Sequence, residues 1–565
     1  MAAGPGGVRR LLPGWVAGYQ RGWLRGDLLA GVTVTAYLIP QVMAYAELAG
    51  LPPVAGLWGV IGALLVYAVV GTSRVLSVGP ESTTALMTAV TIGAVATTPA
   101  EYASLSVALC VVVAAFCVLA GFGGLARLSD LLSKPVLVGY MAGVAGVMVV
   151  SQLGKLTRLD VEADGAGPEV WYVVTHAVDV HVPTLVLALV TAALMIGGSL
   201  VWPRAPMALI GMLGATAAVA LLGLRDRGVV LIGEIPAGLP RPALPDIGVG
   251  SVVDLLLPAL GVTFVAFSDN ILTARAFAAD DERVNPRREL FALGAANLGA
   301  GVMQAFPVSS SGSRTAIAVA VGARSQLAGL VTVAGTILAV VFARPLLEHF
   351  PSAALGAVVV YAATRLVEIP EFRRFGRFRR SELVLALGTT TAVLVVGVLE
   401  GILVAIALSV ADLLRRVSRP HDSVLGFVPH LAGMHDVDDY PEATTIPGLM
   451  VYRYDSPLFF ANAEDFKHRA LAAVDTAIEP VHWFVLNAEA NIEVDITATD
   501  ALEALRQSLT ERGIVFAMAR VKDELRKELE ACGIIDRVGT DRIFPTLPMA
   551  VAAYEQTTGR GGSTP

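Results

Sequence analysis

Residues 77–87 read SVGPESTTALM, a run that places a proline, a carboxylate and several hydroxyls inside an apolar block. A proline with hydroxyls just behind it is typical of a helix start, with Pro80 at the first helical position. A helix that begins there must direct its free N–H groups into protein or a water-filled cavity, because lipid cannot satisfy them. A carboxylate at that depth costs about 2.5–3.5 kcal/mol on insertion scales and is usually functional. Pro80 and Glu81 therefore predict an ion site in mid-membrane.

The composition is that of a polytopic α-helical membrane protein. Of the 565 residues, 55% are hydrophobic and 16% are charged, against about 45–50% and about 25% in soluble domains. The net charge of −7 argues against a nucleic-acid partner. Residues 1–26 are arginine-bearing and only weakly apolar, so we expect a cytoplasmic N-terminal segment without a cleavable signal peptide. The three cysteines lack metal-ligand or disulfide spacing, and no nucleophile–base pair is evident, so we expect neither a metal site of that kind nor an enzyme.

Fourteen apolar blocks predict fourteen membrane-spanning segments. Spanning helices need about 20 residues, and the third and tenth blocks look short or broken, at Pro80 and at 307–313. The blocks are 27–49, 54–70, 78–97, 104–122, 135–153, 183–201, 206–224, 251–272, 288–305, 310–321, 326–347, 352–369, 382–398 and 400–416.

Charged loops orient these segments. In a fourteen-helix arrangement all the basic loops fall on one side, which the positive-inside rule makes cytoplasmic. The acidic loop after the fifth block, with Asp160, Glu162, Asp164, Glu169 and Asp179, falls outside. We therefore expect a multi-pass protein of the cell (plasma) membrane with both termini in the cytoplasm. The basic residues are Arg9, Arg10, Arg21, Arg25, Arg127, Lys134, Arg204, Arg283, Arg287, Arg288, Arg365, Arg373, Arg374, Arg377, Arg379, Arg380, Arg415, Arg416 and Arg419.

The chain shows weak internal symmetry. Seven blocks precede the 225–250 loop and seven follow it, and an odd number inverts the second half relative to the first. The broken third block corresponds to the broken tenth. Interrupted segments in matching positions of two inverted halves are the best sequence pointer to the midplane site of a transporter.

After about Pro420 short strands alternate with helices, which predicts a small soluble α/β domain. Prolines and a glycine at Pro420, Pro429, Gly433 and Pro441 indicate a linker before it. The predicted boundaries are 27–418 for the transmembrane domain (repeats 27–224 and 251–418), 419–446 for the linker, 447–556 for the soluble domain and 557–565 for a disordered tail.

Polar residues in three places could form an anion pocket. Gln41 and Tyr45 lie four apart after Pro40, so they share one helix face; the alternative is an ordinary kinked helix with an interfacial tyrosine. Residues 307–315 read PVSSSGSRT and open the second broken helix. Two facing helix N-termini concentrate free N–H donors, hydroxyls add hydrogen bonds, and Arg314 adds a planar cation, which together suit an oxyanion. The alternatives are a flexible serine loop and an Arg314 that is only a structural partner of Glu81.

Asp269 and Thr273 form a further pair on one helix face. A carboxylate with a hydroxyl one turn away is typical of a sodium site or a proton carrier. The alternative is a helix-end acid near the cytoplasmic face, since Arg275 and Asp280 soon follow.

Several of these stretches resemble the SulP sulfate-permease family. Residues 38–45 (LIPQVMAY), 49–57 (AGLPPVAGL) and 71–80 (GTSRVLSVGP) together look like the family signature, and Ser311–Thr315 (SGSRT) matches its tenth helix. The tail is similar to the family's STAS domain. The likeness covers nearly the whole chain and is strongest to actinobacterial members that are sulfate transporters.

The resemblance implies fourteen helices in seven-plus-seven inverted repeats, divided into core and gate domains. It also implies a homodimer with cytoplasmic STAS domains and an anion site between the third and tenth helices, walled by the first and eighth. Gln41, Tyr45, Ser311, Ser313 and Arg314 fall at the family's substrate positions. Asp269 and Thr273 match the cation-site acid and hydroxyl of sodium-coupled bicarbonate members, and proton-coupled members also carry a carboxylate at the Asp269 position.

Two departures from the family favour protons over sodium as the coupling ion. Many members carry an aliphatic or aromatic residue at the position of Glu81. Ser310 and Gly312 stand where a sodium site favours glycine and threonine. We expect Glu81 and Asp269 to be protonated when the substrate binds.

The sequence therefore predicts a secondary active importer of a small inorganic oxyanion, sulfate first, that works by alternating access as core helices move past gate helices. A sodium-coupled bicarbonate importer and an uncoupled anion channel are the alternatives, and the two buried carboxylates argue against the channel. No cofactor is expected apart from a coupling proton, or a sodium ion at Asp269 and Thr273. The predicted substrate residues are Gln41, Tyr45, Glu81, Ser82, Ser311, Gly312, Ser313 and Arg314, and the coupling residues are Asp269, Thr273 and Glu81.

In the STAS-like region, Thr497 and Thr499 lie at a loop-to-helix start where STAS relatives place a phosphorylation or phosphate-binding site. A regulatory partner or a nucleotide would act there. The alternative is that one of these threonines only caps the helix.

Overall fold

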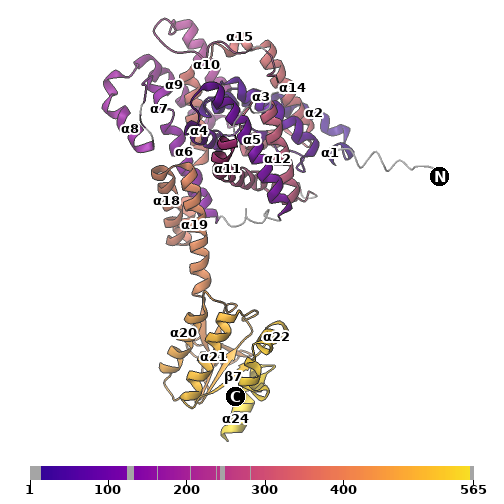
Figure 1. Cartoon of the computed structure of the whole chain (residues 1–565), viewed down its shortest axis with the longest axis vertical. Coiled ribbons are helices and arrows are strands. Elements are labelled where there is room, and N and C mark those ends of the chain that lie inside the picture. The colour runs from indigo at the N-terminus through magenta and orange to yellow at the C-terminus, as the bar shows by residue number, and fades with distance from the viewer. Residues whose placement is uncertain are drawn as a thin grey trace, which may run out of the picture. The chain divides into compact units, whose positions relative to one another are not determined.

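The computed structural model describes residues 14–123, 133–161, 163, 165–203, 205–236, 238–241, 249–279 and 282–559 (Figure 1). It divides into two compact units, Met1–Ser409 and Val410–Pro565. Some residues used for the sequence predictions lie outside the described residues: Arg9, Arg10, Arg127, Glu162, Asp164, Arg204, Asp280 and the predicted tail beyond residue 559.

Each of the fourteen apolar blocks corresponds to a helix in the described part of the chain. The helices are α2 (Leu24–Leu48), α3 (Val54–Val70), α4 (Ser82–Gly93), α5 (Pro99–Phe122), α6 (Lys134–Val150), α9 (Val182–Val201), α10 (Met207–Leu222), α11 (Val249–Ala276), α12 (Pro286–Val302), α13 (Gly312–Val321), α14 (Leu327–Phe342), α16 (Ser352–Leu366), α18 (Arg380–Val396) and α19 (Val398–Ser418).

Shorter helices lie before and between these. Those in stretches predicted mainly as loops or as the N-terminal segment are α1 (Gly14–Ala17), η2 (Arg21–Trp23), α7 (Leu153–Thr157), α8 (Ala166–Thr175), η4 (Ala177–Asp179) and α17 (Ile369–Phe378), whereas α15 (Arg344–Leu347) lies at the end of the predicted block 326–347. The acidic loop after the fifth block therefore contains α7 and α8. The predicted N-terminal segment 1–26 overlaps the start of α2.

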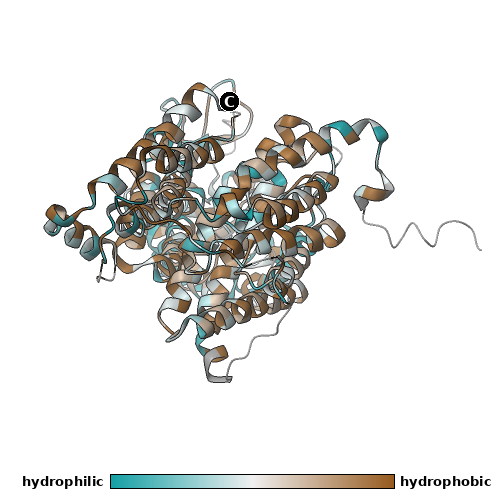
Figure 2. Ribbon diagram, turned by 90° about the horizontal axis from the view of Figure 1, so that it is seen from above, coloured by the Kyte–Doolittle hydropathy of each residue, from teal (hydrophilic) through white to brown (hydrophobic). Residues whose placement is uncertain are grey.

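Within the described residues, six helical spans are long and apolar enough to cross a membrane. They are Arg21–Leu48, Pro99–Phe122, Lys134–Thr157, Val182–Val201, Val252–Ala276 and Ser352–Phe378, with α3, α10 and α14 as shorter apolar helices. Hydrophobic residues lie along most of the helices (Figure 2). Large apolar side chains such as Leu200 (79% exposed) and Val395 (77% exposed) face outward. An outward apolar surface of this kind suits a lipid surrounding.

The third and tenth segments are half-helices, as the sequence predicts. α4 has 12 residues and α13 has 10, too few for the about 20 that a spanning helix needs. Their starts differ from the prediction. Pro80 is not the first helical residue: α4 begins at Ser82 with an extended Glu81 as its N-cap, and α13 begins at Gly312. The residues just before each helix form a strand, which holds them extended.

α3 and α12 approach each other closely through glycine. A Cβ added to Gly62 would overlap the carbonyl oxygen of Gly299, and one added to Gly299 would overlap the carbonyl oxygen of Gly62. Only a residue without a side chain fits on each helix at this contact.

Replacing Gly62 by alanine is therefore expected to destabilise the protein by about 1–3 kcal/mol, the usual cost of overpacking a filled core. The matched control is Gly197→Ala in α9, where an added Cβ would meet no atom within 4 Å. Thermal unfolding of the purified protein in detergent measures the difference. Equal melting temperatures for the two variants would contradict the packing described for α3 and α12.

The C-terminal unit is a six-stranded sheet with the order β4-β3-β5-β6-β7-β8. Strands β5 to β8 run parallel, and β3 pairs antiparallel with β5. Helix α24 packs in the cluster on one face of the sheet, and α20 to α23 pack on the other. The bounds are β3 (Asp422–Phe427), β4 (Met434–Asp436), β5 (Leu449–Tyr454), α20 (Ala463–Asp475), β6 (Trp483–Asn487), α21 (Ile496–Glu511), β7 (Val515–Ala519), α22 (Asp523–Ala531), α23 (Ile534–Val538), β8 (Ile543–Phe544) and α24 (Leu547–Thr558).

The segment 419–446 is not the linker that the sequence predicts. It contains β3 and β4, which add two strands to one edge of the sheet. The prolines and the glycine that indicated a linker fall in the turns around these short strands, and β3 is fixed by its pairing with β5. Helix α24 likewise continues to Thr558, two residues into the predicted tail.

Candidate functional site

The two half-helices start side by side because the residues before them pair. Val78 of β1 (Val78–Gly79) pairs with Ser310 of β2 (Ser309–Ser310) in an antiparallel register. The pairing continues into the helices, since Ser311 N donates to Ser77 O at 2.9 Å and Ser77 N donates to the Thr315 hydroxyl at 3.0 Å. The N-termini of α4 and α13, one from each half of the sequence, therefore meet in the protein interior. Both are positive ends of helix dipoles.

A cavity of about 200 Å³ lies at this junction. It is smaller than the about 300–1,000 Å³ of pockets for drug-sized ligands, which fits a small solute. Seven of the predicted site residues line it: Gln41, Tyr45, Glu81, Ser82, Asp269, Gly312 and Ser313. Tyr37, Thr83, Met141, Ala208, Ser310, Val358, Tyr361, Ala362, Arg365 and Leu366 complete the lining.

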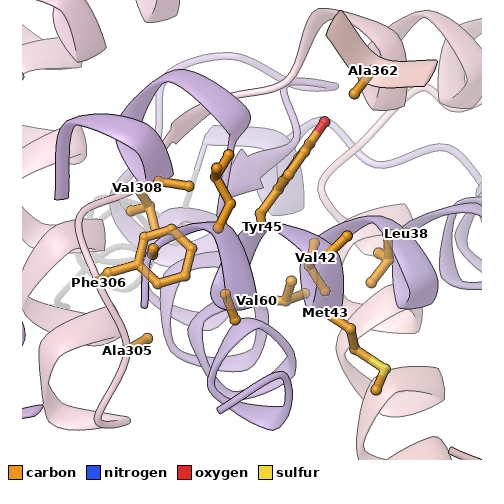
Figure 3. Packing of buried hydrophobic residues seen from close by; sticks show 14 of the residues in the cluster. Leu38, Val42, Met43, Tyr45, Val60, Ala305, Phe306, Val308 and Ala362 are labelled. Atoms are coloured by element: carbon orange, nitrogen blue, oxygen red, sulfur yellow. The ribbon is translucent and has the colours of Figure 1, made fainter. Parts of the chain in front are cut away.

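Helix α2 forms one wall of the cavity. Gln41 and Tyr45 follow Pro40 on one face of the helix, and Gln41 Nε2 donates to Tyr45 Oη at 2.9 Å. Both side chains are buried, and the Gln41 side-chain oxygen accepts no hydrogen bond from the described residues. In Figure 3 the Tyr45 ring points from α2 toward Ala362 of α16. The wall thus presents an amide and a phenol to the cavity.

Glu81 and Arg314 form an ion pair between the two half-helices. Arg314 Nη1 lies 3.5 Å from Glu81 Oε2 and donates to the Pro80 carbonyl at 2.9 Å. Arg314 is 1% exposed. Its Nη2 and the Glu81 Oε2 are buried without a hydrogen-bond partner among the described residues. Unsatisfied buried polar atoms are rare and call for an explanation, such as an unseen ligand.

Asp269 joins α11 to the strand before the second half-helix. Its Oδ2 accepts hydrogen bonds from the Ser309 and Ser310 hydroxyls, at 3.2 and 3.3 Å. Asp269 lies inside α11 and lines the cavity, so it is not an acid at the helix end. The structure therefore places two carboxylates, those of Glu81 and Asp269, on one small cavity.

Three predicted residues do not line the cavity. Ser311 is the N-cap of α13: its hydroxyl accepts from Arg314 N at 3.5 Å and lies 3.3 Å from the Ser313 hydroxyl. Arg314 contacts Glu81 and the Pro80 carbonyl but does not itself line the cavity. Thr273 is buried one turn beyond Asp269, and a Cβ on Gly312 would lie 4.0 Å from its hydroxyl.

A second cation, which the sequence does not predict there, lies at the cavity. Arg365 lies at the end of α16, donates to Tyr361 Oη at 3.0 Å, and stacks over that ring at 5.3 Å. Both residues line the cavity. The positive-inside rule predicts Arg365 in a cytoplasmic loop. Its position four residues after a tyrosine inside an apolar block is the same signal that singled out Gln41 and Tyr45.

The sequence does not predict the role of Glu289 of α12 either. It is fully buried and accepts hydrogen bonds from Tyr67 Oη and Asn270 Nδ2, each at 2.9 Å, and from Thr72 N at 3.1 Å. These donors come from α3, from α11 beside Asp269, and from the segment that leads into β1. Glu289 therefore fixes the elements that carry Glu81 and Asp269 relative to one another.

In the C-terminal unit, helix α21 is capped by Asp495, which accepts from Ala498 N at 2.8 Å. The alternative reading, in which Thr497 or Thr499 caps this helix, is wrong. Thr499 is 4% exposed and donates to Ile496 O at 2.7 Å, whereas Thr497 is exposed. Thr497 is the threonine here whose hydroxyl a partner could reach.

Comparison with known proteins agrees with this architecture. Residues 24–389 match the sulfate permease family and residues 440–550 match the STAS domain. Over 551 residues the chain is 55% identical to a probable sulfate transporter of Mycobacterium tuberculosis, covering 96% of this chain and 98% of that protein. It is 29% identical over 561 residues to the chloroplastic sulfate transporter 4.1 of Arabidopsis thaliana, covering 95% and 81%.

Among solved structures, the murine solute carrier 26 family member A9 anion transporter superposes with a TM-score of 0.86 at 21% identity, covering 99% of this chain and 96% of that one. This likeness confirms the predicted fold, a helical transporter with a C-terminal STAS domain. From its family match, its relatives and its fold, the chain belongs to the sulfate permease family.

Proposed function

We propose that this protein is a secondary active importer of sulfate that is driven by protons and binds the anion between the N-termini of α4 and α13. The observation that carries the proposal is the cavity at this junction, next to a buried arginine whose Nη2 has no hydrogen-bond partner among the described residues. The names of the bacterial and plant relatives support sulfate as the substrate.

Anion binding follows from the donors that meet at the cavity. Free N–H groups at two helix N-termini and the hydroxyls of Ser82 and Ser313 supply hydrogen bonds, and Arg314 supplies charge. Arg365 adds a second cation at the wall. A tetrahedral oxyanion accepts hydrogen bonds from several directions and so suits donors that come from both half-helices.

The two carboxylates supply the proton coupling. With Glu81 and Asp269 ionised, their charges offset those of Arg314 and Arg365, and a dianion would be repelled by the carboxylates. A proton on each carboxylate leaves the two cations unopposed, so sulfate and protons bind together. Release of the protons on the cytoplasmic side restores the repulsion and expels the anion there.

The residues that line the cavity come from two groups of helices, which fits transport by alternating access. Glu81, Ser82, Asp269 and Ser313 come from the half-helices and α11, and α2 adds Gln41 and Tyr45. Met141 of α6, Ala208 of α10 and Tyr361 of α16 lie on the remaining wall. Movement of one group of helices past the other would open the cavity to each side of the membrane in turn.

Neutralising Glu81 tests its role as a proton carrier. In Glu81→Gln we expect sulfate uptake to lose part of its rise as the external pH falls, because the amide cannot take up a proton. The control is Glu47→Gln. The Glu47 carboxylate lies 3.2 Å from Lys155 Nζ and does not line this cavity. Uptake into proteoliposomes across a pH series is the measurement. An unchanged pH dependence in Glu81→Gln would rule out Glu81 as the carrier.

Sodium-coupled bicarbonate import is the second candidate. The oxygens of Ser309 and Ser310 lie 3.2 and 3.3 Å from the Asp269 carboxylate, and hydroxyl and carboxylate oxygens are the ligands that a sodium ion would use. We favour protons because both hydroxyls already donate to the carboxylate. An uncoupled anion channel is disfavoured by the two carboxylates at the cavity.

The remaining proposals concern the setting of the protein. We place it in the plasma membrane with both termini in the cytoplasm, on the basis of the basic loops. We propose a homodimer from the family resemblance, and a regulatory role for the STAS domain in which the exposed Thr497 is the candidate contact or modification site.

A further inference from the structure

Helix α17 is short, basic and strongly amphipathic. Ile369–Phe378 reads IPEFRRFGRF. With 100° between successive residues, Phe372, Phe375 and Phe378 fall on one face. Arg373 and Arg377 fall on the opposite face, and Arg374 lies at the boundary between the two faces. The helix joins α16 to α18, which correspond to the twelfth and thirteenth apolar blocks of the sequence. In the predicted topology it lies where the chain leaves the bilayer and enters it again.

The aromatic face is only partly covered by protein. Phe375 is 4% exposed and packs with Val138 of α6 and Ala386 of α18, with Phe372 and Leu383 against the same cluster. Phe378, at the end of this face, is 68% exposed, and Ile369, which begins the helix beside the basic face, is 54% exposed. The helix is thus fixed to two spanning helices and leaves an apolar side chain uncovered at each end.

The basic face carries more positive charge than the protein neutralises. Arg373, Arg374 and Arg377 are exposed, and Arg379 and Arg380 follow directly. Glu371, the carboxylate within the helix, is shared between Lys134 at 2.9 Å and Arg374 at 3.4 Å. Within the described part of the chain, Arg373, Arg377 and Arg380 form no ion pair.

We propose that α17 is an interfacial helix that binds the phosphate groups of anionic phospholipids in the leaflet next to it. Exposed cations at the ends of spanning helices attract anionic headgroups, and arginine forks match phosphate oxygens. Exposed Ile369 and Phe378 on the same helix select a lipid over a free anion, because acyl chains cover apolar side chains and a free anion does not. Helix α6 carries Val138, which contacts α17, and Met141, which lines the cavity. Lipid binding at α17 would therefore also stabilise the position of α6 at the proposed transport site.

Binding of fluorescent phosphatidylglycerol to the purified full-length protein in neutral detergent tests the proposal. Unlabelled phosphatidylglycerol, phosphatidylcholine and inorganic phosphate serve as competitors. We expect phosphatidylglycerol to compete about tenfold or more better than phosphatidylcholine, given several arginines at the headgroup level, and inorganic phosphate to compete poorly. Equal competition by the two lipids would overturn the proposal. So would displacement of the labelled lipid by phosphate at matched concentration, which would show a site for a diffusible anion.

Three variants assign the effect to α17. The triple variant Arg373→Gln, Arg374→Gln, Arg377→Gln is expected to lose the preference for the anionic lipid, whereas the same three sites changed to lysine should keep most of it. The control changes Lys522, Lys527 and Arg542 to glutamine, which removes the same charge from exposed positions of the STAS domain. If the arginine-to-glutamine triple keeps the preference, or the control loses it, the basic surface of α17 is not the site. Since the readout is lipid binding, its failure is distinct from failure of the proposed transport function.

Discussion

Replacing Arg314 by glutamine is expected to lower sulfate uptake by about 10–100-fold, since each hydrogen bond to a charged group contributes about 1.5–3 kcal/mol and 1.4 kcal/mol is tenfold. The side chain is 1% exposed and lies between the two half-helices, 3.5 Å from Glu81 and 2.9 Å from the Pro80 carbonyl. Its loss removes the buried cation of the proposed anion site and leaves the Glu81 carboxylate without its partner. Initial rates of radiolabelled sulfate uptake into proteoliposomes, below KM, measure the effect.

A double variant separates anion binding from a purely structural ion pair. Arg314→Gln combined with Glu81→Gln removes both charges, so no uncompensated charge stays buried. The double variant should recover the thermal stability that the single variant loses, because an unpaired buried charge is the main source of destabilisation. It should still transport poorly. Recovery of uptake along with stability would show that Arg314 serves only to hold the half-helices through Glu81.

The second large effect is expected from Asp269→Asn, which should lower accumulation of sulfate against its gradient by about tenfold at one pH unit while leaving sulfate–sulfate exchange active. Asparagine keeps the size of the side chain and an oxygen that accepts from Ser309 and Ser310, but it cannot carry a proton. One pH unit across the membrane is 1.36 kcal/mol per proton, so losing one coupled proton lowers accumulation by about tenfold at that gradient.

Accumulation and exchange are measured in the same proteoliposomes, with and without an imposed pH gradient. Thr273→Val is the matched control, because Thr273 lies one turn away on α11 and does not line the cavity. Proton-driven accumulation at the wild-type level in Asp269→Asn would remove Asp269 from the coupling mechanism. A loss of accumulation in Thr273→Val equal to that in Asp269→Asn would favour the sodium site.

Much of the membrane fold could be predicted because lipid imposes simple rules. Each apolar block had to become a helix, and the proline and serine runs at 77–87 and 307–315 had to interrupt two of them. What the sequence could not supply was the exact start of each half-helix. Pairing of Val78–Gly79 with Ser309–Ser310 joins residues more than two hundred positions apart, and it displaces the start of α4 from Pro80 to Ser82.

Part of the site could also be predicted, because residues four apart share one face of a helix. Spacing along one helix identified Gln41 with Tyr45, and it would also have identified Tyr361 with Arg365. The positive-inside rule instead placed Arg365 in a loop, although it lies at the end of α16 and lines the cavity. Nothing in the sequence around Glu289 predicts its role, because the groups that donate to it lie on α3, on α11 and in the segment before β1. In the C-terminal unit, β3 depends on its pairing with β5 and not on its own pattern.

The most direct test of proton-driven sulfate import is uptake of radiolabelled sulfate into proteoliposomes under proton and sodium gradients that are imposed separately. The paired half-helices, the buried Arg314 and the two carboxylates at one cavity predict accumulation above the external concentration when the outside is acidic, and none with sodium alone. Accumulation that requires sodium and ignores pH, or simple equilibration under both gradients, would contradict the account.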